Sequence, residues 1–124
     1  LSYAILVRKE CGEDFLLFSG NDDIVIPVLS LGASGVISVA ANVIPKAFSQ
    51  MVNLYLEGHH KEALDIQLKY LDLINSLFIE ANPIPLKEMM NQLGHNVGDF
   101  RFPLYPISDD GRLVIEGIVK RYFK

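Results

Sequence analysis

A polar cluster, Gly20-Asn21-Asp22-Asp23, follows a short apolar run and has residue types that bind ligands. Folds of the α/β class place their ligands at the carboxyl ends of parallel strands, where the amino terminus of the next helix attracts anions. The cluster therefore predicts a ligand site at the end of a strand. The alternative interpretation is structural, with Gly20 making a tight turn while Asn21 and Asp22 cap the helix that follows.

The histidines and the cysteine predict neither a metal site nor a nucleophile. His59 and His60 are adjacent, so their side chains diverge on a helix, and neither has a Cys or a second His three or four residues away. Cys11 is the only cysteine, and the flanking Glu10 and Glu13 do not stabilise a thiolate. We expect Cys11 to be packed and inert, and we expect no metal and no cofactor.

The lysines do not predict Schiff-base chemistry within this chain. A lysine needs burial to lower its pKa enough for that role, and no lysine lies in an apolar strand segment. Residues 32–35 (GASG) precede a strand instead of following one, so they predict a turn and not a phosphate cradle. We therefore expect no catalytic residue in the chain. The lysines assigned to helices or their ends are Lys46, Lys61, Lys69, Lys87, Lys120 and Lys124.

Two apolar segments must position the polar cluster. Residues 15–19 (FLLFS) and 35–40 (GVISVA) are typical of strands buried on both faces. A helix predicted from Asn21 to about Leu31 separates them, which implies parallel pairing. Because two parallel strands leave both sheet edges open, and because residue 1 is not Met, we expect the C-terminal part of a larger α/β protein.

The remainder of the chain is predicted to be helical. Residues 1–10 read as the end of a helix that Gly12 stops, and Ser108 is the predicted cap of the last helix. A stripe on the long helix is expected to pack against neighbours: Leu64, Leu68, Leu71, Ile74, Leu77 and Phe78. The other predicted helices cover residues 45–57, 61–80, 86–93 and 109–123.

Composition limits the remaining function classes. The chain has 124 residues, a formal net charge of -4 and 50% hydrophobic residues, which excludes a multidomain or disordered protein. No basic cluster predicts nucleic acid as a partner, and no apolar run is long enough to predict a membrane span. A single cysteine fits a reducing compartment, so we expect a cytoplasmic protein.

Four segments together resemble the C-terminal part of the dihydrodipicolinate synthase family, within the pyruvate-dependent Schiff-base aldolases. They read FSGNDD, LGASGVISVAANV, ANPIPLK and FRFPLYPISDDGR. The resemblance runs from Leu1 to Lys124 and implies the last two strands of a (β/α)8 TIM barrel followed by a helical C-terminal domain. Residues 1–57 would form the last two βα units of the barrel, and residues 58–124 would form the helical domain.

The same resemblance implies a function for the whole protein. Family members are lyases of lysine and diaminopimelate biosynthesis that condense pyruvate with L-aspartate 4-semialdehyde through a lysine Schiff base. They usually assemble as homotetramers. The Schiff-base lysine would lie a few residues before Leu1, so the isolated fragment is expected to be inactive. Two substrate-binding positions of the pyruvate pocket map onto Gly20 and Ile37, although Ile37 also fits an ordinary core position.

Two other functions remain open at this point. One is a different pyruvate-lysine aldolase, for instance one acting on 2-keto-3-deoxy sugar acids. The resemblance to the sialic acid lyase branch is weaker, because that branch usually has Glu at the position of Asp23 and Ser at the position of Val39. The other is a noncatalytic assembly module, in which the two strands are a stub and the helices mediate subunit contacts.

Overall fold

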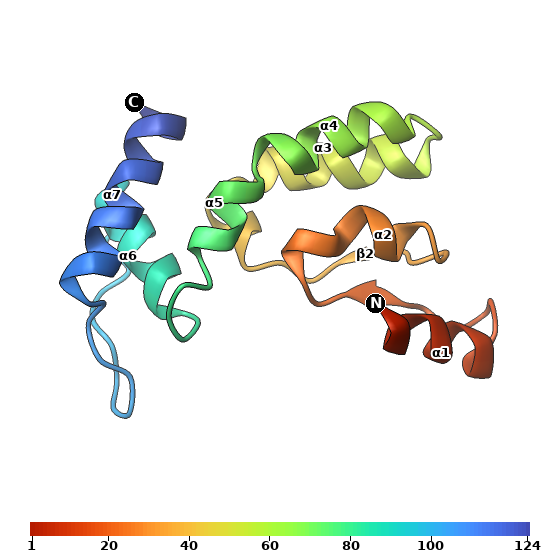
Figure 1. The fold of residues 1–124 in the computed structure, drawn as a ribbon, viewed down its shortest axis with the longest axis horizontal. Helices are drawn as coiled ribbons and strands as arrows, with labels where there is room; N and C mark the ends of the chain where they lie inside the picture. Colours follow the sequence, from red (N-terminus) through yellow and green to blue (C-terminus); the bar gives the residue numbers. More distant parts are fainter. The chain divides into compact units, whose positions relative to one another are not determined.

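The computed structural model describes residues 1–124 and divides the chain into two compact units, Leu1–Tyr70 and Leu71–Lys124 (Figure 1). The first unit contains a small sheet and the helices around it. The second unit is entirely helical. Each unit has buried apolar side chains of its own.

The first unit is built around two short parallel strands. β1 (Phe18–Ser19) pairs with β2 (Gly35–Val36), and Phe18 lies opposite Gly35. This confirms the predicted parallel pairing. The other elements, in chain order, are α1 (Ser2–Cys11), η1 (Asp22–Ile24), α2 (Val25–Leu29), η2 (Ala40–Asn42), α3 (Pro45–Leu56) and α4 (His60–Lys69).

The prediction that both strands are buried on two faces is wrong for this chain. Leu16 and Phe18 are 71% and 46% exposed, whereas Ser19 is buried. Two hydrogen bonds extend the pairing slightly beyond the assigned strands. The Ser34 N–H donates to the Leu17 carbonyl, and the Ile37 N–H donates to the Ser19 carbonyl. A strand is buried on both faces only where other elements pack on each face, and within this chain α2 is the helix that contacts both strands.

Helices α3 and α4 pack side by side, and both contact α2 (Figure 1). The predicted stripe is only partly correct, because Leu64 and Leu68 are exposed while Ala63 and Gln67 of α4 are buried. The face that α4 buries is therefore rotated from the predicted one. The core side chains of this unit are Val25, Val28, Leu29, Ala33, Ala40, Val43, Ile44, Phe48, Met51 and Ala63.

The second unit consists of α5 (Leu71–Ser76), α6 (Ile84–Gln92) and α7 (Asp109–Phe123), and α7 packs on both of the others. The single helix predicted over 61–80 is interrupted at Tyr70. Beyond that residue, Asp72 accepts hydrogen bonds from Arg121 and Tyr122, about fifty residues away in the chain. These long-range contacts hold α5 against α7, and they are not encoded in the local periodicity that predicts one helix.

Helix α7 begins where the sequence predicts. The hydroxyl of Ser108 accepts a hydrogen bond from the Gly111 N–H at 3.0 Å, which confirms the predicted cap. The same hydroxyl donates to Glu80 Oε1 at 2.6 Å. A Cβ at Gly111 would lie 2.9 Å from the Ile107 side chain, so the close approach requires glycine.

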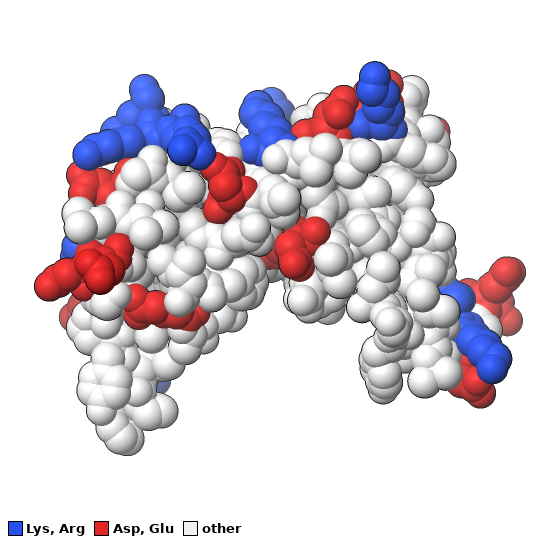
Figure 2. Space-filling model, viewed as in Figure 1, with Lys and Arg blue, Asp and Glu red and all other residues white.

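Charged side chains are paired on the second unit. On the face shown in Figure 2, basic side chains lie beside acidic ones near the C-terminal end of α7. Lys120 pairs with Glu116 at 2.6 Å, and Arg121 pairs with Asp72. None of the helices has the length and apolar character that crossing a membrane requires.

Candidate functional site

The two predicted site positions lie at neighbouring strand ends. Gly20 directly follows β1, and Ile37 directly follows β2. The Ile37 N–H donates to the Ser19 carbonyl at 2.9 Å, which holds the two strand ends together. Because the strands are parallel, both positions are at the carboxyl edge of the sheet, where α/β folds bind ligands.

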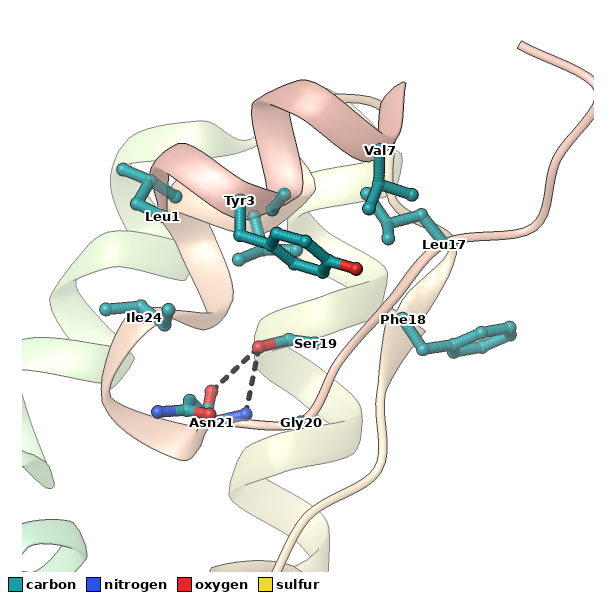
Figure 3. A pocket seen from close by; sticks show the side chains of 11 residues that line it. Leu1, Tyr3, Val7, Leu17, Phe18, Ser19, Gly20, Asn21 and Ile24 are labelled. Atoms are coloured by element: carbon teal, nitrogen blue, oxygen red, sulfur yellow. Dashed lines mark hydrogen bonds between the residues drawn. The ribbon is translucent and has the colours of Figure 1, made fainter. Parts of the chain in front are cut away.

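A cavity of about 330 Å³ opens beside the end of β1 (Figure 3). Its walls come from α1, from the segment 17–21 and from α2 with the turn before it. The lining is largely apolar, and the Ser19 hydroxyl, which donates to the Asn21 carbonyl at 2.8 Å, is part of its polar surface. The lining residues are Leu1, Tyr3, Ala4, Val7, Leu17, Phe18, Ser19, Gly20, Asn21, Ile24 and Val28.

Gly20 lines this cavity, and nothing inside the chain requires it to be glycine. Its φ is not in the left-handed region, and a Cβ built there would meet no atom within 4 Å. Space is therefore open above its backbone. This is the local condition that close approach of a ligand needs.

Ile37 does not line the cavity beside α1, and its side chain is 75% exposed. It does not serve as a core residue of this chain. Its backbone is nevertheless fixed next to Ser19, one residue before Gly20. The assignments of Gly20 and Ile37 to a pyruvate pocket remain predictions.

The alternative interpretation, in which Asn21 and Asp22 cap the helix that follows, is wrong. Asn21 makes no side-chain cap hydrogen bond to η1. Asp22 is 2% exposed, and its Oδ2 accepts hydrogen bonds from the N–H groups of Val39 at 3.0 Å and Ala40 at 2.8 Å. The carboxylate thus joins the segment after β1 to the segment after β2, a long-range contact that local capping rules do not predict.

Gln67 of α4 is a second residue that sequence reasoning missed. It is 3% exposed, its Oε1 accepts from the Ile26 N–H at 2.8 Å, and its Nε2 donates to the Asp23 carbonyl. It lies four residues after the buried Ala63 and so on the same buried face of α4, where an uncharged amide needs partners. The sequence predicted a different buried face, so it gave no signal for Gln67.

The remaining candidates are spread over the surface. Cys11 is exposed, so the expectation of a packed cysteine is wrong; it is the last residue of α1, a helix that has no buried residue. His59 faces Glu62 at 3.7 Å, whereas His60 stacks on Tyr55. Lys87 is half-buried, and its ammonium lies 4.8 Å from the Phe100 ring centre.

Comparison with known proteins matches nearly the whole chain to one protein family. The model of the dihydrodipicolinate synthetase family matches residues 1–122. A 4-hydroxy-tetrahydrodipicolinate synthase of Brachyspira hyodysenteriae is 49% identical over 106 residues, which cover 86% of this chain and 36% of that protein. The corresponding enzyme of Clostridium novyi is 47% identical over 123 residues, covering 99% of this chain and 42% of that protein.

Solved structures agree with this grouping. The crystal structure of dihydrodipicolinate synthase from Aquifex aeolicus is 37% identical and superposes with a TM-score of 0.92. The match covers 98% of this chain and 41% of that one. A structure described as the first monomeric dihydrodipicolinate synthase variant is 34% identical, with a TM-score of 0.85, and the match covers 94% of this chain and 39% of that one. The chain therefore spans about two fifths of the length of these relatives.

Proposed function

The chain belongs to the dihydrodipicolinate synthetase family, and from this we propose that it forms part of a lyase that condenses pyruvate with L-aspartate 4-semialdehyde. The observation that carries the proposal is the family match over residues 1–122, together with the meeting of Gly20 and Ile37 at one sheet edge. The reaction would proceed through a lysine Schiff base and serve lysine and diaminopimelate biosynthesis.

We assign the Schiff-base lysine to a part of the enzyme outside residues 1–124. Every lysine of the chain is exposed except Lys87, which is half-buried and donates a hydrogen bond to the Asp99 carbonyl. A lysine amine becomes a nucleophile at neutral pH when burial or a nearby cation lowers its pKa. The surroundings of these lysines supply no such burial.

Within that enzyme, we assign the walls of the pyruvate pocket to Gly20 and Ile37. The open space above Gly20 would let the ligand approach the backbone at the end of β1. The exposed branched side chain of Ile37 would supply an apolar surface that excludes water from the bound keto acid. Both positions would act by binding and orienting the substrate and not by proton transfer.

The finer architecture follows the same proposal. We infer that residues 1–57 supply the last two βα units of a (β/α)8 barrel and that residues 58–124 belong to a helical C-terminal domain. The compact units of the chain divide after Tyr70, because α4 packs on α3. We also propose a cytoplasmic homotetramer, with the monomeric variant among the relatives as the alternative outcome.

The experiment that tests the proposal is borohydride trapping of the native protein in the presence of pyruvate, followed by intact mass measurement. We expect one reduced pyruvate adduct per subunit and turnover with L-aspartate 4-semialdehyde. An adduct with turnover only on 2-keto-3-deoxy sugar acids would favour a different aldolase of the same group. A protein without any adduct would favour the assembly module.

A further inference from the structure

Asp22 is a buried carboxylate that connects two segments distant in sequence. Its Oδ2 accepts the N–H groups of Val39 and Ala40, seventeen and eighteen residues away. Hydrogen bonds in which the acceptor is ionised are stronger than neutral ones. The carboxylate therefore fixes the backbone that leaves β2 against the backbone that leaves β1.

The turn held by Asp22 is the one that carries Ile37. On one side, the Ile37 N–H donates to the Ser19 carbonyl at 2.9 Å. On the other side, Asp22 holds residues 39 and 40, and the Ser38 hydroxyl accepts from the Ala41 N–H at 2.8 Å. The Ile37 backbone is thus fixed both before and after the residue.

Asp22 is itself held in place from α4. Gln67 binds the backbone of Asp23, the residue after Asp22, and of Ile26 in α2. The start of η1 and α2 is therefore attached to a neighbouring helix through a buried amide. This second attachment makes the carboxylate a fixed support for the 39–40 backbone.

The arrangement is costly for a merely structural contact. Asp22 is almost fully buried, and its Oδ1 has no hydrogen-bond partner within the chain. Burying a carboxylate with an unsatisfied oxygen costs free energy that a well-packed apolar residue would not. Such local conflicts concentrate at functional sites.

We propose that Asp22 is a positioning residue of the pyruvate pocket: through the N–H groups of Val39 and Ala40, it holds the Ile37 turn against the Gly20 end of β1. This inference rests on the proposed function and adds to it the residue that sets the pocket geometry. Asp22 touches no substrate in this role.

The test uses the full-length enzyme with Asp22→Ala, Asp22→Asn and the control Asp65→Asn, which changes an exposed carboxylate of α4. Two quantities are measured: hydrogen exchange of the Val39 and Ala40 amides, and the KM for pyruvate. We expect Asp22→Ala to lose amide protection and to raise the KM for pyruvate about tenfold or more, because small displacements of positioning groups are costly. Asp65→Asn should change neither quantity.

Asp22→Asn separates the acceptor from the charge, since an amide oxygen can accept both N–H groups. We expect it to keep the amide protection and a KM near that of wild type, and it decides the matter if Asp22→Ala does not fold. The proposal is overturned if Asp22→Ala loses protection with an unchanged KM, or if Asp22→Asn raises the KM while the amides stay protected. A wild-type enzyme that forms no borohydride-trapped pyruvate adduct instead overturns the proposed function, and the pocket assignment with it.

Discussion

Gly20 stands at the end of β1 with no conformational or packing reason to be glycine. We expect Gly20→Ala to change the free energy of unfolding by less than about 1 kcal/mol, because the added Cβ meets no atom within 4 Å of the chain. In the full-length enzyme, the same methyl group would intrude on the proposed pocket and raise the KM for pyruvate about tenfold. Urea unfolding and steady-state kinetics measure the two effects separately.

Gly117 is the matched control for this substitution, since a Cβ there also meets no atom and the residue is exposed on α7. Gly117→Ala should leave the KM unchanged. If Gly20→Ala instead lowers stability with normal kinetics, Gly20 is a turn residue and not a pocket residue.

Asp72 predicts a pH dependence for the second unit. The hydrogen bond from Tyr122 is the largest influence on its pKa, and with the Leu73 N–H and Arg121 it outweighs burial, so the pKa lies below the usual 3.8. The group therefore stabilises the folded state above pH 3.8, and this contribution is lost as pH falls through the lowered pKa. Burial and the neighbouring Asp72 raise the pKa of Tyr122 above its usual 10.0. The protonated hydroxyl therefore stabilises the folded state below pH 10, and this contribution is lost as pH rises through the raised pKa.

Acid unfolding of wild type and Asp72→Asn measures this effect at the α5–α7 contact. We expect the variant to be less stable at neutral pH and to show a flatter stability curve below pH 3.8. Asp65→Asn, which changes an exposed carboxylate of α4, is the control. Parallel curves of unfolding free energy against pH for wild type and Asp72→Asn would show that protonation of Asp72 does not affect stability.

One side chain of α1 makes several hydrogen bonds to other parts of the first unit. Arg8 donates to the carbonyls of Leu31 and Gly32 after α2 and to three carbonyls that follow α1, those of Gly12, Glu13 and Phe15. Because no residue of α1 is fully buried, we expect these bonds to contribute much of its attachment.

We expect Arg8→Ala to destabilise this region by about 2 kcal/mol, since several carbonyls lose a charged donor together. Hydrogen exchange of the α1 and residue 12–15 amides in the native protein measures the effect. Lys9→Ala is the control, because Lys9 is exposed and pairs only with its neighbour Glu10 at 3.6 Å. Equal exchange in both variants would contradict the role assigned to Arg8.

Elements with local signals could be predicted, and those set by distant contacts could not. The bounds of α7 followed from Ser108 and the acidic first turn, and the parallel pairing of β1 and β2 followed from the helix between them. The interruption at Tyr70 and the buried face of α4 depend on tertiary partners. The role of Asp22 could not be predicted for the same reason. Its residue type and position predict a helix cap, but its Oδ2 accepts hydrogen bonds from Val39 and Ala40, which follow the other strand.

The first unit leaves several large apolar side chains exposed, among them Tyr3, Leu16, Phe18 and Ile37. We expect the isolated 124-residue chain to associate, because large apolar side chains exposed in this number are normally covered by other parts of a protein or by a partner. Sedimentation velocity across a dilution series measures this, with Leu16→Ser and Ile37→Ser expected to reduce it. A compact monomer that persists at every concentration would contradict the expectation.

Borohydride trapping of the native protein with pyruvate is the measurement that decides whether this chain is part of a pyruvate-dependent Schiff-base lyase. We predict that the intact subunit gains one reduced pyruvate adduct, that peptide mapping finds the modified lysine outside residues 1–124, and that L-aspartate 4-semialdehyde protects against trapping by consuming the intermediate. A subunit that gains no adduct would contradict the proposed function. An adduct on a lysine within residues 1–124 would contradict the assignment of the Schiff-base lysine to another part of the enzyme.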